Sequence, residues 1–178
     1  MAASKFELKE HHASIANVNN RIQRHGEERQ LAADIKFNLS APNTILDAFD
    51  PSLRKDLFRK PNRGEQQDLP HIGGDGLTEV KHTCLEPLKL NHEFTGYELQ
   101  IDGHLDGTEP IVLVDVKLKK FVATPREGGS VDLSFTASAE IDSAEAAELT
   151  EAFLREDIRL SLSRPEKAEQ QEQSDLAA

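Results

Sequence analysis

The sequence predicts an α+β fold in which an antiparallel sheet packs with two helices. Three observations support this prediction. Apolar and polar residues alternate in several runs, which is typical of half-buried strands. Two amphipathic stretches with helical spacing each follow a pair of such runs. Both stretches end in a similar motif, which reads LRKDL at residues 53–57 and LREDI at residues 154–158.

The first half of the chain predicts a hairpin followed by helical structure. Residues 14–18 and 34–40 alternate as strands, and the polar connection at 24–28 is typical of a hairpin turn. Apolar residues then recur at every fourth position within residues 43–60, so they share one helix face. Pro51 interrupts this pattern, which indicates either one kinked helix or two short ones.

The second half repeats this order after a loop rich in Gly and Pro at residues 61–78. Asp142 or Ser143 is expected to cap the second helix, because both side chains can accept hydrogen bonds from the free N–H groups of a first turn. An acidic residue soon after, Glu145, suits the helix dipole. The predicted strands of this half occupy residues 97–101, 111–114, 116–121, 131–139 and 158–162.

The shared order of elements indicates two pseudo-repeated ββα units, at residues 14–60 and 111–162. The other interpretation is that a hairpin followed by a helix recurred without common ancestry, as it does in many α+β proteins. Either interpretation gives an antiparallel sheet with two helices. We expect one domain over residues 1–162 and a disordered tail over residues 163–178, where polar residues dominate.

Composition narrows the classes of function and location. The chain has 178 residues and a net charge of −11, which disfavours general affinity for nucleic acids or anionic membranes. The single cysteine, Cys84, cannot form an internal disulfide, and this fits a reducing compartment. The N-terminal residues lack the apolar stretch of a signal peptide. These features predict a soluble cytoplasmic protein.

No combination of residues in the sequence is diagnostic of catalysis. The histidines show no metal-ligand spacing, and a structural zinc site would need further cysteines or histidines in a set pattern. A nucleophilic Cys84 would need a base and an orienting group that the sequence does not place beside it. We therefore expect a protein that is not an enzyme, with no cofactor and no metal.

Two charged stretches are candidate binding sites. The acidic residues of the second predicted helix stand three apart on one flank and would suit a basic groove on a partner protein. The first predicted helix and its flank carry a local basic patch, which could track the phosphates of a single nucleic-acid strand. Arg21, Arg24 and Arg29 of the predicted hairpin could lie nearby. The acidic candidates are Glu145, Glu148 and Glu151, and the basic candidates are Arg54, Lys55, Arg59, Lys60 and Arg63.

The run IVLVDVKLKKFVATPREGGSVDLSF, which begins at Ile111, resembles uncharacterised small proteins of tailed bacteriophages. Such proteins are often encoded among early or DNA-metabolism genes. The resemblance implies a phage protein that works inside a bacterial cell and assigns no catalytic residue. Together with the acidic flank, it predicts a binding protein that engages a host or phage protein, for example an anti-CRISPR-like inhibitor of host defence. The alternative is a single-strand nucleic-acid-binding accessory of phage recombination or replication.

Overall fold

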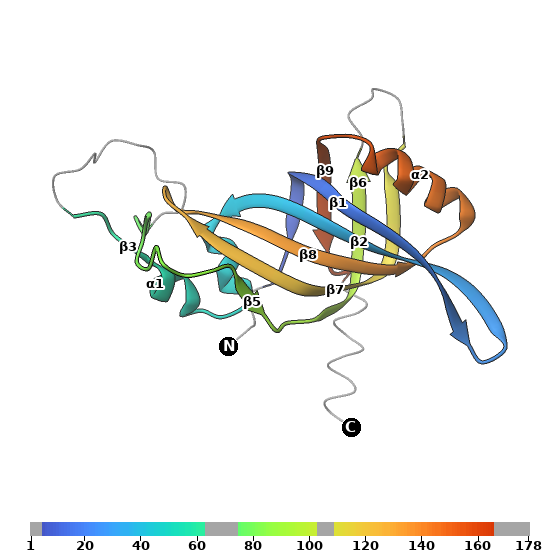
Figure 1. The fold of residues 1–178 in the computed structure, drawn as a ribbon, viewed down its shortest axis with the longest axis horizontal. Coiled ribbons are helices and arrows are strands. Elements are labelled where there is room, and N and C mark those ends of the chain that lie inside the picture. The colour runs from blue at the N-terminus through green and yellow to red at the C-terminus, as the bar shows by residue number, and fades with distance from the viewer. Residues whose placement is uncertain (1–4, 63–74, 103–108, 166–178) are drawn as a thin grey trace.

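The computed structural model describes residues 5–62, 75–102 and 109–165, and most of them lie in long antiparallel strands (Figure 1). Six strands form the main body: β1 (Leu8–His25), β2 (Glu28–Pro42), β6 (Phe94–Asp102), β7 (Ile111–Arg126), β8 (Ser130–Glu140) and β9 (Ile158–Ser163). The shorter strands are β3 (Phe58–Arg59), β4 (Glu79–Val80) and β5 (Leu88–Leu90). The helices are the 3-10 helix η1 (Asn43–Ala48), α1 (Leu53–Leu57) and α2 (Ser143–Phe153).

The six long strands close into an antiparallel barrel. Their order is β7-β6-β9-β1-β2-β8, and β8 returns to pair with β7. Strand β7 closes the barrel because it pairs on both of its edges: residues 111–118 pair with β6 and residues 117–126 pair with β8. Strand β5 adds to β7 as an extra strand, and β3 and β4 form a separate two-stranded sheet.

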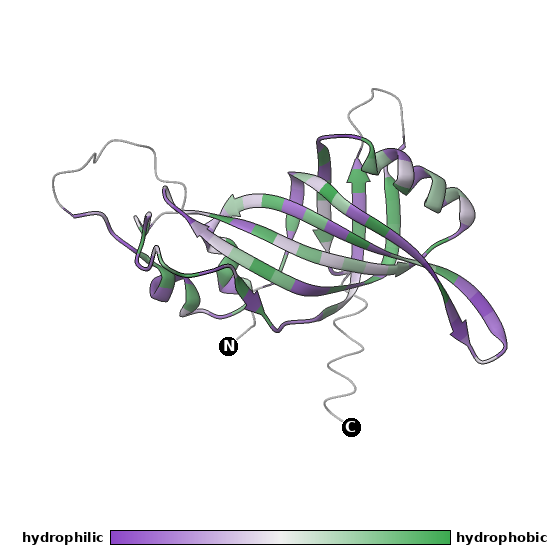
Figure 2. Cartoon of the chain, viewed as in Figure 1, coloured by the Kyte–Doolittle hydropathy of each residue, from purple (hydrophilic) through white to green (hydrophobic). Residues whose placement is uncertain are grey.

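The alternation of the sequence places one face of each strand inside the barrel. Ile35 and Phe37 of β2 lie opposite Ala137 and Phe135 of β8, and all four side chains are buried. The alternating colours along the strands in Figure 2 show the same pattern. Burial of these apolar faces is the main stabilising contribution to such a fold.

Irregularities let the long strands curve around the barrel. The ladder between β1 and β2 shifts register between Ile15 and Asn17, and the ladder between β7 and β8 shifts between Lys119 and Val122. Asp115 and Lys120 of β7 have positive φ angles of 53° and 56°. Such bulges bend a strand and increase its twist, which closure of a small barrel requires.

Helical segments lie at the two ends of the barrel (Figure 1). At one end, η1 and α1 bury Leu46, Phe49 and Leu57 against a cluster of phenylalanine rings. Phe6, which precedes β1, is at the centre of that cluster. At the other end, α2 packs on β1 and buries Leu149.

The predicted α+β fold is wrong: the structure is mostly β and closes into a barrel. The two predicted ββα units, 14–60 and 111–162, do not exist as separate units because the β1–β2 and β7–β8 hairpins belong to one barrel. In the first half, the helical pattern breaks around Pro51 into η1 and the one-turn helix α1. The sequence showed the period of each strand but carried no signal for its non-local partners.

Several local predictions are confirmed. Both hairpins, the strands around residues 97–101 and 158–162, and a second helix capped by Asp142 are present. Ser163, the first residue of the predicted tail, is the last residue of β9. Residues 166–178, and most of the predicted loop at 61–78, lie outside the described residues. Within the described ranges, no helix is long and apolar enough to cross a membrane.

Candidate binding surfaces

The acidic flank of α2 divides into two parts with different roles. Asp142 and Glu145 form a capping box at the start of the helix. The Asp142 carboxylate accepts a hydrogen bond from the Glu145 N–H at 2.8 Å, and the Glu145 carboxylate accepts one from the Asp142 N–H, also at 2.8 Å. The Glu145 carboxylate is bonded to the backbone, so the main role of this side chain is to stabilise the helix.

Glu148 and Glu151 are the part of the flank that is available to a partner. Both carboxylates are exposed, and neither forms an ion pair within the part of the chain that the structure describes. They border a hollow of about 210 Å³ between α2 and the strands β6 and β7. The other residues that line this hollow are Ile101, Glu109, Ile111, Ala152 and Arg155.

Exposed apolar residues are also found on α2 and on β7. Phe153 and Leu154, at the C-terminal end of α2, are 41% and 79% exposed. Val112 and Val114 of β7 also point outward and are exposed. Apolar side chains next to unpaired charges are typical of surfaces that bind other proteins.

Another hollow, of about 690 Å³, is lined in part by the first turn of α2. Its walls come from the end of the β1–β2 hairpin, the middle of β7, the end of β8 and the first turn of α2. The charged residues that line it are Arg21, Lys117 and Lys119 on the basic side and Asp115, Glu140, Asp142 and Glu145 on the acidic side. Charges of both signs and a mostly open shape favour a macromolecular contact over a small-molecule pocket.

A partly buried network around Asp34 supports the basic side of this hollow. The Asp34 carboxylate accepts hydrogen bonds from the Ser138 hydroxyl and from Arg21 Nε at 3.2 Å, and Lys119 Nζ lies 3.7 Å away. Burial alone would raise the pKa of Asp34, but these hydrogen bonds and the two cations outweigh it and lower the pKa below its usual 3.8. The carboxylate is therefore held in its charged form.

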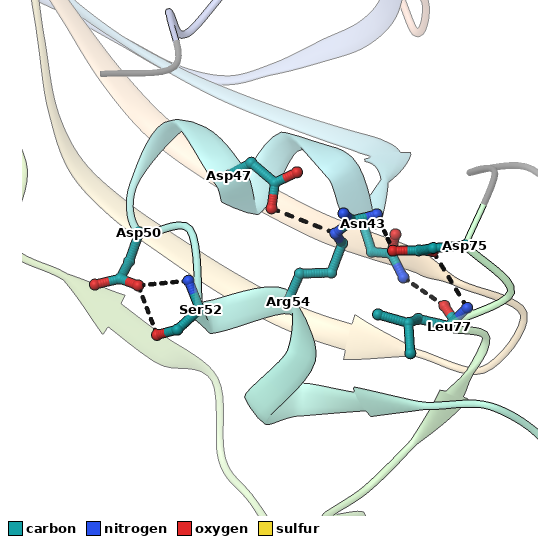
Figure 3. Close-up of polar contacts among 7 residues, drawn as sticks. All are labelled: Asn43, Asp47, Asp50, Ser52, Arg54, Asp75 and Leu77. Atoms are coloured by element: carbon teal, nitrogen blue, oxygen red, sulfur yellow. Dashed lines mark hydrogen bonds and ion pairs between the residues drawn. The ribbon is translucent and has the colours of Figure 1, made fainter. Parts of the chain in front are cut away.

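The structure does not form the predicted basic patch as one free surface. The side chain of Arg54 is only 16% exposed, and its guanidinium lies between Asp47, at 3.3 Å, and Asp75, at 2.7 Å (Figure 3). Beside it, Asn43 is buried and its amide donates a hydrogen bond to the Leu77 carbonyl at 2.7 Å. Arg54 thus ties the segment from η1 to α1 to the segment that precedes β4.

The remaining basic candidates differ in their surroundings. Arg59 forms an ion pair with Glu79 across the β3–β4 sheet. Lys55 and Lys60 are exposed. Arg63 lies outside the described residues. Of the five predicted contacts, two therefore already have acidic partners, because the fold brings Asp47, Asp75 and Glu79 to them.

Sequence reasoning underestimated a different pair of arginines. Arg24 and Arg29 lie directly opposite each other at the end of the β1–β2 hairpin, both exposed. Their symmetrical placement about the Gly26-Glu27 turn was visible in the sequence, but the exact pairing became clear only from the strand register.

Among the described residues, no group of three or more His, Cys, Asp or Glu side chains is placed to hold a metal ion. Cys84 is exposed and forms no disulfide. No protein-family model, curated protein or solved structure matches the chain.

Proposed function

We propose that the chain is a non-enzymatic binding protein, encoded by a phage, that engages a host or phage protein through α2. The observation that carries this proposal is the pair of exposed carboxylates, Glu148 and Glu151, one turn apart beside a hollow and exposed apolar residues. The site of action is the cytoplasm of the bacterial host. An inhibitor of host defence, similar in role to an anti-CRISPR protein, is one concrete form.

The chemistry of this surface favours a partner with a basic, partly apolar contact. A lysine or arginine of the partner could enter the hollow beside Glu148 and Glu151, while Phe153 and Leu154 supply the apolar contact. The helix is fixed by its capping box and by burial of Leu149, so the backbone that carries the two carboxylates is held in place before binding. A preorganised surface loses less conformational entropy on binding. The charges would increase the association rate and the specificity.

The alternative proposal is a single-strand nucleic-acid-binding accessory of phage recombination or replication. Lys55 and Lys60 are the exposed cations that favour it. The ion pairs of Arg54 and Arg59 reduce its support, because an arginine held by carboxylates is less available to a phosphate. Its signature would be an affinity that falls steeply with salt.

A pull-down from bacterial lysate, with and without nuclease, tests the leading proposal. We expect a defined protein to be retained after nuclease treatment by the wild type and lost by the variant Glu148→Gln/Glu151→Gln. The matched control Glu7→Gln/Glu86→Gln removes two exposed carboxylates elsewhere and should retain the protein. Equal retention by all three proteins would contradict the assignment of α2, and a catch that disappears with nuclease would favour the alternative.

A further inference from the structure

The end of the β1–β2 hairpin, residues 20–31, forms an arm that projects beyond the barrel (Figure 1). Its two strands join through the loop Gly26-Glu27, in which Gly26 has a φ of 63°. A positive φ at the first loop position is what a type II′ hairpin turn requires, and this turn preserves the twist of the flanking strands. The arm is therefore a regular ribbon, with a defined register up to the pair His25 and Glu28.

Two arginines on one face of the arm lack an acidic partner. Arg24 pairs with Arg29 across the ribbon, and neither forms an ion pair within the described residues. Side chains at such positions have Cβ atoms about 4.5–5.5 Å apart, and like charges there destabilise the pair. On the opposite face, by contrast, Arg21 is bonded to Asp34 and His25 to Glu140. The repulsion between Arg24 and Arg29 is therefore not offset by an acidic side chain on their face of the arm. On the opposite face, each cation has an acidic partner.

An exposed apolar residue lies next to the two arginines. Ile22 is on the same face as Arg24, two positions earlier, and it is 61% exposed. Its cross-strand neighbour is Leu31. The same face of the hairpin points into the barrel at Val18, which lies opposite Ile35. At Ile22 the hairpin has left the barrel, so the core no longer covers this face.

The arm also has an open backbone edge. Strand β1 pairs with β9 only as far as Ala13, and α2 packs on β1. Within the described residues, the outer edge of β1 in the projecting arm, residues 20–25, has no strand neighbour. An edge of this length presents a row of N–H and C=O groups that can pair with another strand.

Three kinds of occupant can be compared with these features. A nucleic-acid strand would satisfy Arg24 and Arg29, but it would leave Ile22 and the β1 edge uncovered. A second copy of β1, paired about Ile22, would satisfy the edge and Ile22 but would bring no carboxylate to Arg24. An extended acidic peptide satisfies all three, because peptide addition supplies backbone hydrogen bonds together with side chains on one face.

We propose that the arm binds an extended, acidic segment of a partner protein as an added strand along β1. One carboxylate of that segment lies opposite Arg24, and an apolar side chain two positions away lies opposite Ile22. Recognition therefore favours a repeating pattern in which an acidic and an apolar residue alternate on one face of the segment. This proposal uses Arg24 and Ile22 of the arm, whereas the proposal for α2 uses Glu148 and Glu151, so the two proposals can fail independently.

Fluorescence anisotropy with a labelled peptide tests this inference on the full chain. The probe repeats Glu-Thr-Val-Thr, which places glutamate and valine alternately on one face and threonine on the other. We expect binding at low salt that weakens about tenfold in Arg24→Ser/Arg29→Ser, because the charge pair between Arg24 and the peptide carboxylate is lost. The control Lys55→Ser/Lys60→Ser removes two exposed cations elsewhere, and Glu148→Gln/Glu151→Gln alters only α2. Both should bind like the wild type.

Two further measurements separate strand addition from simple charge attraction. Arg29→Glu would pair with Arg24 inside the arm, so it should stabilise the fold slightly while reducing peptide binding. In an extended peptide, the N–H groups of alternate residues point to the same edge. Two peptides, one N-methylated at the odd positions and one at the even positions, therefore each lose the hydrogen-bond donors of one edge. We expect one of them not to bind. The inference is overturned if the peptide does not bind, or if both methylated peptides bind as well as the unmethylated one. It is also overturned if Arg24→Ser/Arg29→Ser loses binding to oligothymidine, a single-stranded DNA probe, but keeps binding to the peptide.

Discussion

Arg54 shows why charged residues are difficult to assign from sequence alone. In the sequence it belongs to a local cluster of cations, and the nearest acidic neighbour along the helix, Asp56, does not pair with it. In the structure it is mostly buried between Asp47 and Asp75, which reach it from η1 and from the segment before β4. The charge of a residue can be read from the sequence, but its partner depends on the tertiary structure.

Asp34 is the residue for which the structure gives a prediction about pH. Its pKa is lowered in the folded protein, so its charged form stabilises the fold above the unfolded pKa of about 3.8. That contribution is lost as the pH falls from about 5 through the folded pKa. We expect Asp34→Asn to be less stable than the wild type at pH 7, and the difference to shrink on acidification. Urea unfolding at pH 7 and pH 3 measures this, and a difference independent of pH would contradict it.

At the scale of elements, α2 was the most predictable part of the molecule. Its start was predicted from Asp142 and the early glutamates, and a capping box forms between Asp142 and Glu145. This prediction succeeded because a cap depends on residues three positions apart. The role of Glu145 is the part that sequence could not separate, since the same carboxylate suits a cap and a contact surface.

Removal of the cap should destabilise the protein measurably. We expect Asp142→Ala to lower the free energy of unfolding by about 1 kcal/mol, because the Glu145 N–H loses its acceptor. Ser143→Ala, which changes the next residue without touching the capping box, is the matched control. Denaturant unfolding followed by circular dichroism distinguishes the two variants, and equal stabilities would show that the capping box contributes little.

The two hairpins were also predicted from alternation and turn residues, but their lengths were underestimated. The alternating signal at residues 14–18 covers only part of β1, because the outer part of that strand lies on the arm and is polar except for Ile22. Strand formation there follows from pairing with β2 and not from local burial. The arm could therefore not be predicted as an extension of the hairpin.

At the scale of the whole molecule, barrel closure depends on pairings that are distant in sequence. Strand β9 pairs with β1 and with β6, and β2 pairs with β8. Alternation fixes which face of each strand is buried, but any neighbour with a similar pattern would satisfy it. The fold class was wrong for this reason, although most of the strands that compose it were correctly placed.

Phe6 lies at the centre of the aromatic cluster at one end of the barrel. Its buried ring contacts those of Phe49, Phe94, Phe121 and Phe135, with centroids 5.3–5.8 Å apart. We expect Phe6→Ala to lower the free energy of unfolding by about 3–5 kcal/mol, since a cavity would remain among four rings. Phe153→Ala makes the same chemical change at an exposed position and should cost far less. Similar losses for both variants would contradict the central role of Phe6.

The position of β9 in the barrel has a consequence for synthesis of the chain on the ribosome. This strand is the last to be translated, yet it lies between β1, the first strand, and β6. A nascent chain that ends before β9 leaves the edges of both neighbours without a partner, and such edges promote aggregation. The barrel can consequently close only after β9 has been synthesised, and we expect a chain that ends before β9 to form an open sheet in place of a smaller folded protein.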